Sequence, residues 1–215
     1  MARRALPITA ATLTATAALL LSACGGDDDK SPDDTKAADA GSSPSASASA
    51  TTPPLAKRPD ITIPSSFQLT FEDWTSSDPR RQAVLDDAEE EVRAGYAAII
   101  ANDPDSESVA FYDTEGVRGQ TKEWIKSYTD KNLTVIGKLP SFNPRVVLAE
   151  NGQGAALTYC TDESDAKTRN RKTGKVEGNP AGTNPYVVYA VSLTKNEQGV
   201  WQNSSVRSER GKCSR

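Results

Sequence analysis

The chain of 215 residues carries a formal net charge of −4 and contains no histidine. This acidic balance excludes the clustered basic surface that nucleic-acid binding requires, so we expect no nucleic-acid partner. The lack of histidine excludes histidine-based acid–base pairs, Ser–His and Cys–His nucleophiles, and zinc sites that contain histidine. No other pattern indicates a cofactor or a metal, and we expect neither.

The N-terminal residues have the features of a bacterial export signal. Two arginines at positions 3 and 4 precede an uncharged run of Ala, Thr and Leu that is short for a membrane span. The run ends at Leu21-Ser22-Ala23-Cys24, which resembles the lipobox of bacterial lipoproteins. This resemblance implies a signal peptide over residues 1–23, a lipid on Cys24 and a place at the outer face of the cell membrane. Ordinary secretory cleavage near Ala23 is the alternative, and the export route, general or twin-arginine, stays open.

Residues 24–60 have the composition of a linker that follows the lipidated N-terminus. They are rich in Asp, Ser, Ala and Pro, and Leu55 is the one large aliphatic residue among them. Such a segment buries too little apolar surface to offset the entropy lost on ordering, so we predict a disordered linker. Apolar residues return at Ile61, and we expect a single domain over residues 61–215.

A long helix is predicted first in this domain, after a lead-in anchored by Trp74. Asp78 has the position of an N-cap, and Pro79 suits the first helical position. Apolar residues recur at helical spacing over residues 84–100, and Asn102 precedes the Asp-Pro pair that ends the helix. We expect the acidic residues among positions 86–91 to cover its outer faces.

A short element over residues 109–112 and a second long helix over residues 120–130 are expected next. Gly116 and Gly119 between them are predicted to bracket a turn. Strands are then expected over residues 133–139, 145–150, 155–161, 186–195 and 200–207, with Pro140 ending the first. A polar loop covers residues 162–185. The fold class is therefore α+β, with N-terminal helices packed on a curved antiparallel sheet of four to five strands.

The three cysteines are divided between two roles. Once Cys24 is assigned to the lipid, Cys160 and Cys213 remain as one pair. An extracytoplasmic compartment permits a disulfide, which we predict between them. Two buried free thiols are the alternative.

The order of elements resembles nuclear transport factor 2 and its relatives. The resemblance depends on the long first helix and on the terminal hairpin 186–206, which carries Gly199 and Trp201. The closing Gly211-Lys212-Cys213, with Cys160 upstream, is similar to secreted actinobacterial lipoproteins that contain such a domain. A cone-shaped fold with a cavity is implied. The candidate pocket residues are Tyr96, Phe111, Trp124, Tyr128 and Trp201.

The expected function is that of a membrane-anchored envelope lipoprotein. We expect its domain to bind an envelope protein or a small hydrophobic ligand, with no catalysis, because no catalytic constellation is visible. Asp113, beside Tyr112, is the carboxylate nearest an apolar cluster, and we interpret it as a turn residue. The alternatives are a cyclase- or isomerase-type enzyme that uses a pocket carboxylate, and an accessory module for cell-wall machinery. Basic residues at positions 167–175 are interpreted as a solvated loop.

Overall fold

The computed structural model describes residues 56–215 of the chain. The predicted signal peptide, Cys24 and the predicted linker as far as residue 55 lie outside the described residues. Over the described range, no helix is both long enough and apolar enough to cross a membrane.

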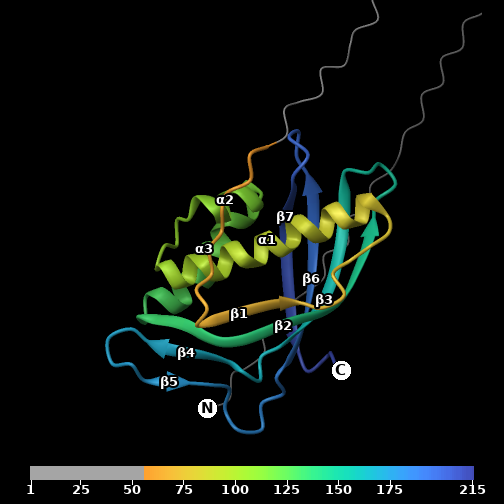
Figure 1. The fold of residues 1–215 in the computed structure, drawn as a ribbon. Helices are drawn as coiled ribbons and strands as arrows, with labels where there is room; N and C mark the ends of the chain where they lie inside the picture. The colour runs from red at the N-terminus through yellow and green to blue at the C-terminus, as the bar shows by residue number, and fades with distance from the viewer. Residues whose placement is uncertain (1–55) are drawn as a thin grey trace, which may run out of the picture. The chain divides into compact units, whose positions relative to one another are not determined.

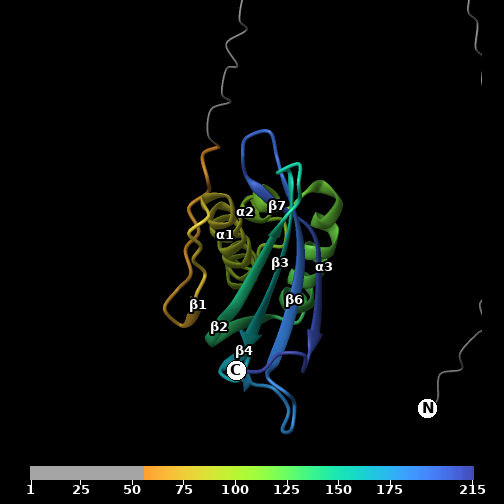
Figure 2. The ribbon, with the colours of Figure 1, turned by 90° about the vertical axis from the view of Figure 1, so that its right-hand side faces the viewer.

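Three helices pack against one side of a curled sheet (Figures 1 and 2). The helices are α1 (Pro79–Ala101), α2 (Glu107–Tyr112) and α3 (Glu115–Thr129). The strands are β1 (Phe67–Phe71), β2 (Leu133–Leu148), β3 (Gly154–Asp162), β4 (Ala166–Asn170), β5 (Val176–Glu177), β6 (Tyr186–Lys195) and β7 (Trp201–Arg210). The predicted α+β class is confirmed, and the arrangement is consistent with a nuclear transport factor 2-like fold.

Helix α1 begins and ends where the sequence predicted. The carboxylate of Asp78 accepts a hydrogen bond of 2.9 Å from the backbone N–H of Arg80, and Pro79 is the first helical residue. Asn102 closes the helix in the left-handed conformation at φ 60°, which asparagine adopts more readily than most residues. Local capping chemistry therefore fixes the length of the element on which the site is built.

Helix α3 begins earlier than predicted, at Glu115 instead of Gln120. Gly116 and Gly119 lie inside the helix, so the predicted turn between them is wrong. Each glycine disfavours the helix by up to about 1 kcal/mol relative to alanine. Burial of Val117 and Ile125 on the inner face outweighs that local preference.

The sheet contains seven strands in the order β5-β4-β2-β3-β6-β7, with β1 paired in parallel to β2. The remaining strand pairs are antiparallel. The lead-in supplies β1, and the predicted loop over residues 162–185 supplies β4 and β5, which explains the excess over four to five strands. Strands β4 and β5 lie at the sheet edge and lack apolar alternation, so their sequence does not predict pairing.

Strand β2 continues through Pro140, where we predicted a break. Pro140 pairs with Thr70 of β1, and the pairing with β3 begins at the next residue, Ser141. The proline thus lies between the residues of β2 that pair with β4, which end at Gly137, and those that pair with β3. A bulge between Phe142 and Arg145 then bends the strand and contributes to the curl of the sheet.

Residues that precede Ile61 contact the domain. Ala56 packs against buried core side chains, and the guanidinium Nη2 of Arg58 lies 2.7 Å from Oδ1 of Asp87. Arg58 is held in place because it neutralises a carboxyl that the core would otherwise bury alone.

The disulfide between Cys160 and Cys213 is present. It joins β3 to the tail that follows β7 and closes a loop with a sequence separation of 53 residues. Chain entropy makes such a loop worth about 4 kcal/mol. Beyond it, the guanidinium of Arg215 lies 4.8 Å from the ring centre of Phe142.

Candidate functional site

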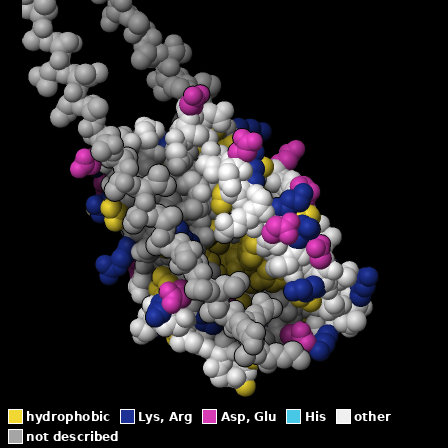
Figure 3. All heavy atoms as spheres, turned by 180° about the vertical axis from the view of Figure 1, so that it is seen from behind, with side chains coloured by type: hydrophobic (Ala, Val, Ile, Leu, Met, Phe, Trp, Pro, Cys, Tyr) yellow, Lys and Arg dark blue, Asp and Glu magenta, His cyan; other side chains and the backbone are white. Residues whose placement is uncertain are grey.

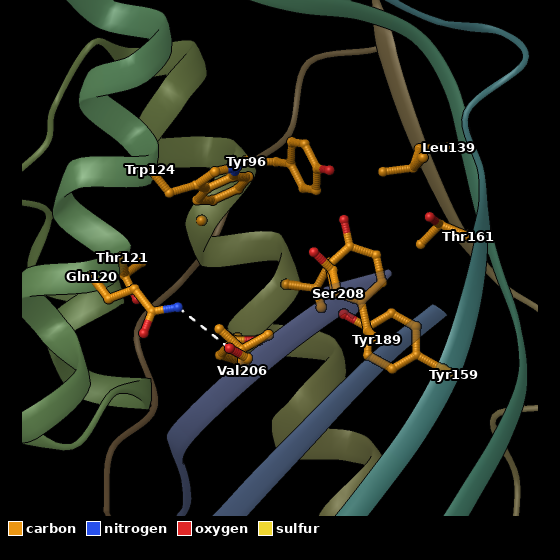
Figure 4. A pocket seen from close by; sticks show the side chains of 13 residues that line it. Tyr96, Gln120, Thr121, Trp124, Leu139, Tyr159, Thr161, Tyr189, Val206 and Ser208 are labelled. Carbon is orange, nitrogen blue, oxygen red and sulfur yellow. Dashed lines mark hydrogen bonds between the residues drawn. The ribbon is translucent and has the colours of Figure 1, made fainter. Parts of the chain in front are cut away.

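A cavity of about 260 Å³ lies between helices α1 and α3 and the inner face of the sheet (Figure 4). Helix α1 contributes Glu91, Gly95 and Tyr96, while α3 contributes Thr121 and Trp124. Strands β2, β3, β6 and β7 supply the opposite wall. The cavity is large enough for a small organic molecule.

Aromatic rings make up much of the wall. The rings of Tyr159 and Tyr189 are stacked, with centroids 5.1 Å apart and an angle of 8° between their planes. On the helical side, the indole of Trp124 meets the ring of Tyr96 edge-to-face at 5.4 Å. Such surfaces favour flat, apolar ligands.

Gly95 lets Trp124 lie directly against helix α1. A Cβ atom at this position would lie 2.8 Å from Cζ3 of the indole ring. Glycine disfavours a helix interior by about 1 kcal/mol relative to alanine. Its presence in the middle of α1 is therefore explained by the space that the Trp124 ring needs at the cavity wall.

Glu91 is the carboxyl of the cavity. It projects inward from α1, which corrects the prediction that the acidic residues among positions 86–91 cover the outer faces. Burial, and to a smaller extent the nearby carboxylate of Asp113, raise the pKa of Glu91 to about 8. One hydrogen bond opposes this rise in pKa, a 3.3 Å bond from the Asn203 amide nitrogen to Oε1 of Glu91. A carboxyl of this kind can hold or release a proton near neutral pH.

Asp113 is close enough to Glu91 to affect its pKa, does not line the cavity and is only 1% exposed. It caps α2 and forms an isolated parallel bridge with Asn203 at the start of β7. Asp113 thus lies in the connection between α2 and α3, in agreement with a turn position, but its side chain is buried. Burial raises the pKa of its carboxyl, and neither carboxyl oxygen has a hydrogen-bond partner among the described residues.

Two of the five predicted pocket residues line the cavity, namely Tyr96 and Trp124. Tyr128 packs against the core that contains Ile99 and Ile125, beside the indole of Trp124 at 6.0 Å between ring centroids, and does not line the cavity. Phe111 packs against the same core, and Trp201 is buried in a second one that contains Trp74 and Leu157. These three are corrected to packing positions, because aromatic spacing alone does not separate core from cavity.

Polar residues of the cavity were missed by the sequence analysis. Glu91 belongs to a run of acidic residues, and its helical face is shared with Asp87 and Gly95 at intervals of four. That stripe, with a glycine in a helix interior, is the signal that could have revealed it. Thr161 of β3 is also missed; it is buried, and its hydroxyl has no partner among the described residues.

The basic residues at positions 167–175 are partly engaged by the domain itself. The guanidinium of Arg171 donates to the carbonyl oxygens of Ile99 and Ile100 at the end of α1, at 2.6 and 3.1 Å. The ammonium of Lys175 pairs with Glu177. On the face drawn in Figure 3, acidic and basic side chains are interspersed around a hollow that contains hydrophobic side chains.

No family model matches the chain, and no curated protein does. Solved structures similar to it include a ketosteroid isomerase-like protein from Erwinia carotovora atroseptica, with 15% identity and a TM-score of 0.39 over 58% of this chain and 94% of that one. A protein described as a dehydratase of the NTF2-like family from Streptomyces avermitilis has 13% identity and a TM-score of 0.40, over 60% and 98%. An epoxide hydrolase/cyclase-like enzyme of pyran ring formation in salinomycin has 16% identity and a TM-score of 0.29, over 60% and 95%.

The prediction of a domain without catalysis is corrected. The similar solved structures bear the names of an isomerase-like protein, a dehydratase and a cyclase-like enzyme. The described domain also places a desolvated carboxyl in its cavity, whereas we expected no catalytic constellation. The likeness itself concerns the arrangement of helices and strands, so the chemistry has to be argued from the cavity of this chain.

Proposed function

We propose that the domain is an enzyme that transfers a proton to or from a small, uncharged and largely apolar molecule held in the cavity. A single observation carries the proposal. The carboxyl of Glu91 faces an aromatic cavity, and burial raises its pKa to about 8. An acid–base catalyst works best when its pKa lies close to the pH of reaction.

The proton chemistry follows from the surroundings of Glu91. Below pH 8 the carboxyl is mainly protonated and can act as a general acid. Above that pH it is mainly ionised, and a carboxylate shielded from water is a stronger base than one in solution. Isomerisation and ring closure both need such a group beside an apolar substrate, which is why these reaction classes suit the site.

The lining of the cavity favours an uncharged ligand. None of the residues that line it is a lysine or an arginine, so an anionic group would meet Glu91 without a compensating cation. The rings of Tyr96, Trp124 and Tyr159 provide apolar contact. The hydroxyls of Thr161 and Ser208 on the strand side offer hydrogen bonds that orient a polar substituent.

A nitrobenzisoxazole probe tests the proposal without knowledge of the natural substrate. A base removes the ring C–H proton of this flat, neutral compound, the N–O bond breaks, and a coloured nitrile-bearing phenolate forms. We expect the rate to rise with pH and to level off above about 8, because the ionised form of Glu91 is the base.

The matched variants are Glu91→Gln and Glu89→Gln, which make the same chemical change on the same helix. Glu89 does not line the cavity. We expect Glu91→Gln to lower the probe rate about a hundredfold and Glu89→Gln to leave it within about twofold. Equal rates for Glu91→Gln and the unchanged protein would rule out Glu91 as the base.

We also propose that the chain is anchored by a lipid on Cys24 at the outer face of the bacterial membrane. The support is the Leu21-Ser22-Ala23-Cys24 sequence and the linker composition that follows it. Two or three acyl chains give stable anchoring, whereas one does not. We expect Cys24→Ser to move the protein from the membrane fraction to the soluble fraction and to abolish labelling with a fatty acid. Unchanged fractionation of Cys24→Ser would contradict the anchor.

A further inference from the structure

Three buried side-chain oxygen atoms of Asp113 and Asn203 have no hydrogen-bond partner among the described residues. They are Oδ1 and Oδ2 of Asp113 and Oδ1 of Asn203. Asp113 and Asn203 are each 1% exposed. Buried polar atoms without partners are costly, so a group of three in one place needs an explanation.

The backbone holds these side chains together. The N–H of Thr114 donates to the carbonyl oxygen of Asn203 at 2.9 Å, and Asp113 and Asn203 form a parallel bridge. The side-chain amide of Gln202 donates to the carbonyl oxygen of Phe111 at 2.7 Å. The start of β7 is thus fastened to the end of α2, which keeps the backbones of Asp113 and Asn203 side by side.

Asn203 lies between the two carboxyls. Its amide nitrogen donates to Oε1 of Glu91 at 3.3 Å. The amide of Asn203 and the hydroxyl of Thr121 also approach the carboxyl of Asp113 and oppose the rise in its pKa, although neither reaches it with hydrogen-bond geometry. Both carboxyls therefore face the side-chain amide of Asn203, whose nitrogen donates to Glu91 while its oxygen receives no donor.

A proton on either carboxyl gives the unpartnered oxygen of Asn203 a donor. If Asp113 is protonated, its O–H donates to Oδ1 of Asn203 while the amide nitrogen keeps its bond to Glu91. If Glu91 is protonated and the amide is turned over, the Glu91 O–H donates to Oδ1 and the amide nitrogen serves Asp113. An asparagine amide accepts either orientation, because its two ends have nearly the same shape.

We propose that Glu91 and Asp113 hold one proton between them across Asn203, and that Asp113 is the positioning residue that controls the protonation of Glu91. The inference rests on the proposed function, since it concerns the regulation of the same site. It goes beyond that function because it assigns a role to a residue outside the cavity lining.

The charged groups around the pair do not neutralise it. On α1, the carboxyl of Asp87 one turn before Glu91 is committed to Arg58, and Glu90 pairs with Arg93. From α3, the guanidinium of Arg118 is bonded to backbone carbonyl oxygens of Ala110 and Asp113. The phenols of Tyr159 on β3 and Tyr189 on β6 are the titratable groups that face Glu91 from the sheet. Two buried negative charges without a dedicated cation repel each other, so the pair retains a proton.

The test is a pH titration of the side-chain carboxyl carbons by NMR in the purified protein and two variants. Asp113→Asn removes one charge with little change of shape, and Glu91→Gln does the same from the other side. We expect Asp113→Asn to lower the Glu91 midpoint by about one pH unit from its starting value of about 8. The midpoint should stay above the ordinary 4.5, because burial is the larger cause of the shift.

The two variants have different expected effects. Since Glu91 keeps its proton until about pH 8, it is neutral while Asp113 ionises, and Glu91→Gln should leave the Asp113 midpoint nearly unchanged. The exposed Asp105→Asn is the control and should shift neither midpoint. A Glu91 midpoint that is unchanged in Asp113→Asn would overturn the proposal. Should Asp113→Asn fail to fold, Asp113→Ser removes the same charge and gives the same comparison.

The titration and the probe reaction can fail separately. A Glu91 midpoint that falls in Asp113→Asn, with a probe rate that is the same in Glu91→Gln, would support the proton pair and contradict the proposed function. A probe rate that depends on Glu91, with a Glu91 midpoint that does not respond to Asp113→Asn, would support the function and overturn the pair. If both hold, the pH profile of the probe reaction in Asp113→Asn moves to lower pH by the shift seen in the titration.

Discussion

Two acidic side chains point inward from the same face of α1, one helical turn apart, and their surroundings differ. Asp87 lies 2.7 Å from the guanidinium of Arg58 and accepts a 2.9 Å hydrogen bond from the backbone N–H of Trp201. Glu91 receives one 3.3 Å bond from the neutral amide of Asn203 and faces another carboxyl. The Asp87 carboxylate is compensated by a cationic partner, whereas the Glu91 carboxyl has none.

The difference separates a structural charge from a chemical one. Burial raises the pKa of both groups, but Arg58 and the Trp201 N–H oppose the rise at Asp87. A compensated buried charge keeps its protonation state and contributes to stability through its partners. An uncompensated one gains and loses a proton easily, and such groups are typical of active sites.

The largest expected effect is that of Glu91→Gln on stability. The pKa of Glu91 is about 8 in the folded state and 4.5 ordinarily, so the folded protein binds the proton more tightly. Stability is then highest at low pH and is lost as the pH rises from 4.5 through 8. We expect Glu91→Gln to raise the free energy of unfolding by about 5 kcal/mol well above pH 8 and by little below pH 4.5. Urea unfolding at several pH values measures this difference. A gain that does not depend on pH would contradict the account.

Asp87→Asn should act in the opposite direction. The change leaves the guanidinium of Arg58 without its anionic partner and weakens the hydrogen bond from Trp201. We expect a loss of about 2 kcal/mol in the free energy of unfolding at neutral pH. Urea unfolding of Asp87→Asn and Glu91→Gln under the same conditions compares their free energies of unfolding. If the two variants change stability with the same sign above pH 8, the distinction between the two carboxyls fails.

The smallest effect concerns Gly95, the next residue along the stripe that holds Asp87 and Glu91. Alanine in a helix interior is favoured by about 1 kcal/mol over glycine, but a Cβ here would lie 2.8 Å from the Trp124 ring. We expect Gly95→Ala to gain less than that amount and to alter tryptophan fluorescence. Gly119→Ala, where a Cβ meets nothing within 4 Å, is the control and should show the full gain without the fluorescence change. Equal gains in both variants would mean that the ring is not held by Gly95.

Local chemistry made much of the fold predictable. Asp78, Pro79 and Asn102 mark the ends of α1, and the Cys160–Cys213 pair follows from counting cysteines once Cys24 is set aside. These features depend on a few neighbouring residues or on composition. Strands β4 and β5 could not be predicted, because their pairing depends on the path of β2 and not on their own sequence.

The site was predictable only in part. Tyr96 and Trp124 were found because aromatic residues at helical spacing mark an inner face. Glu91 was missed because acidic residues usually occupy the outside of a helix. Whether it is compensated depends on Asn203, more than 100 positions away in the chain, and on the bridge between Asn203 and Asp113. Contacts of that range are set by the fold and have no local signal.

The most direct test of the central claim is the midpoint of the Glu91 carboxyl in the unchanged protein. NMR of the side-chain carboxyl carbons can follow it, with Glu91→Gln to assign the signal, and the chain has no histidine to titrate in the same range. We expect a midpoint of about 8. A midpoint near the ordinary 4.5 would show that Glu91 is solvated and ionised at neutral pH, and would contradict its role as the acid–base group of the cavity.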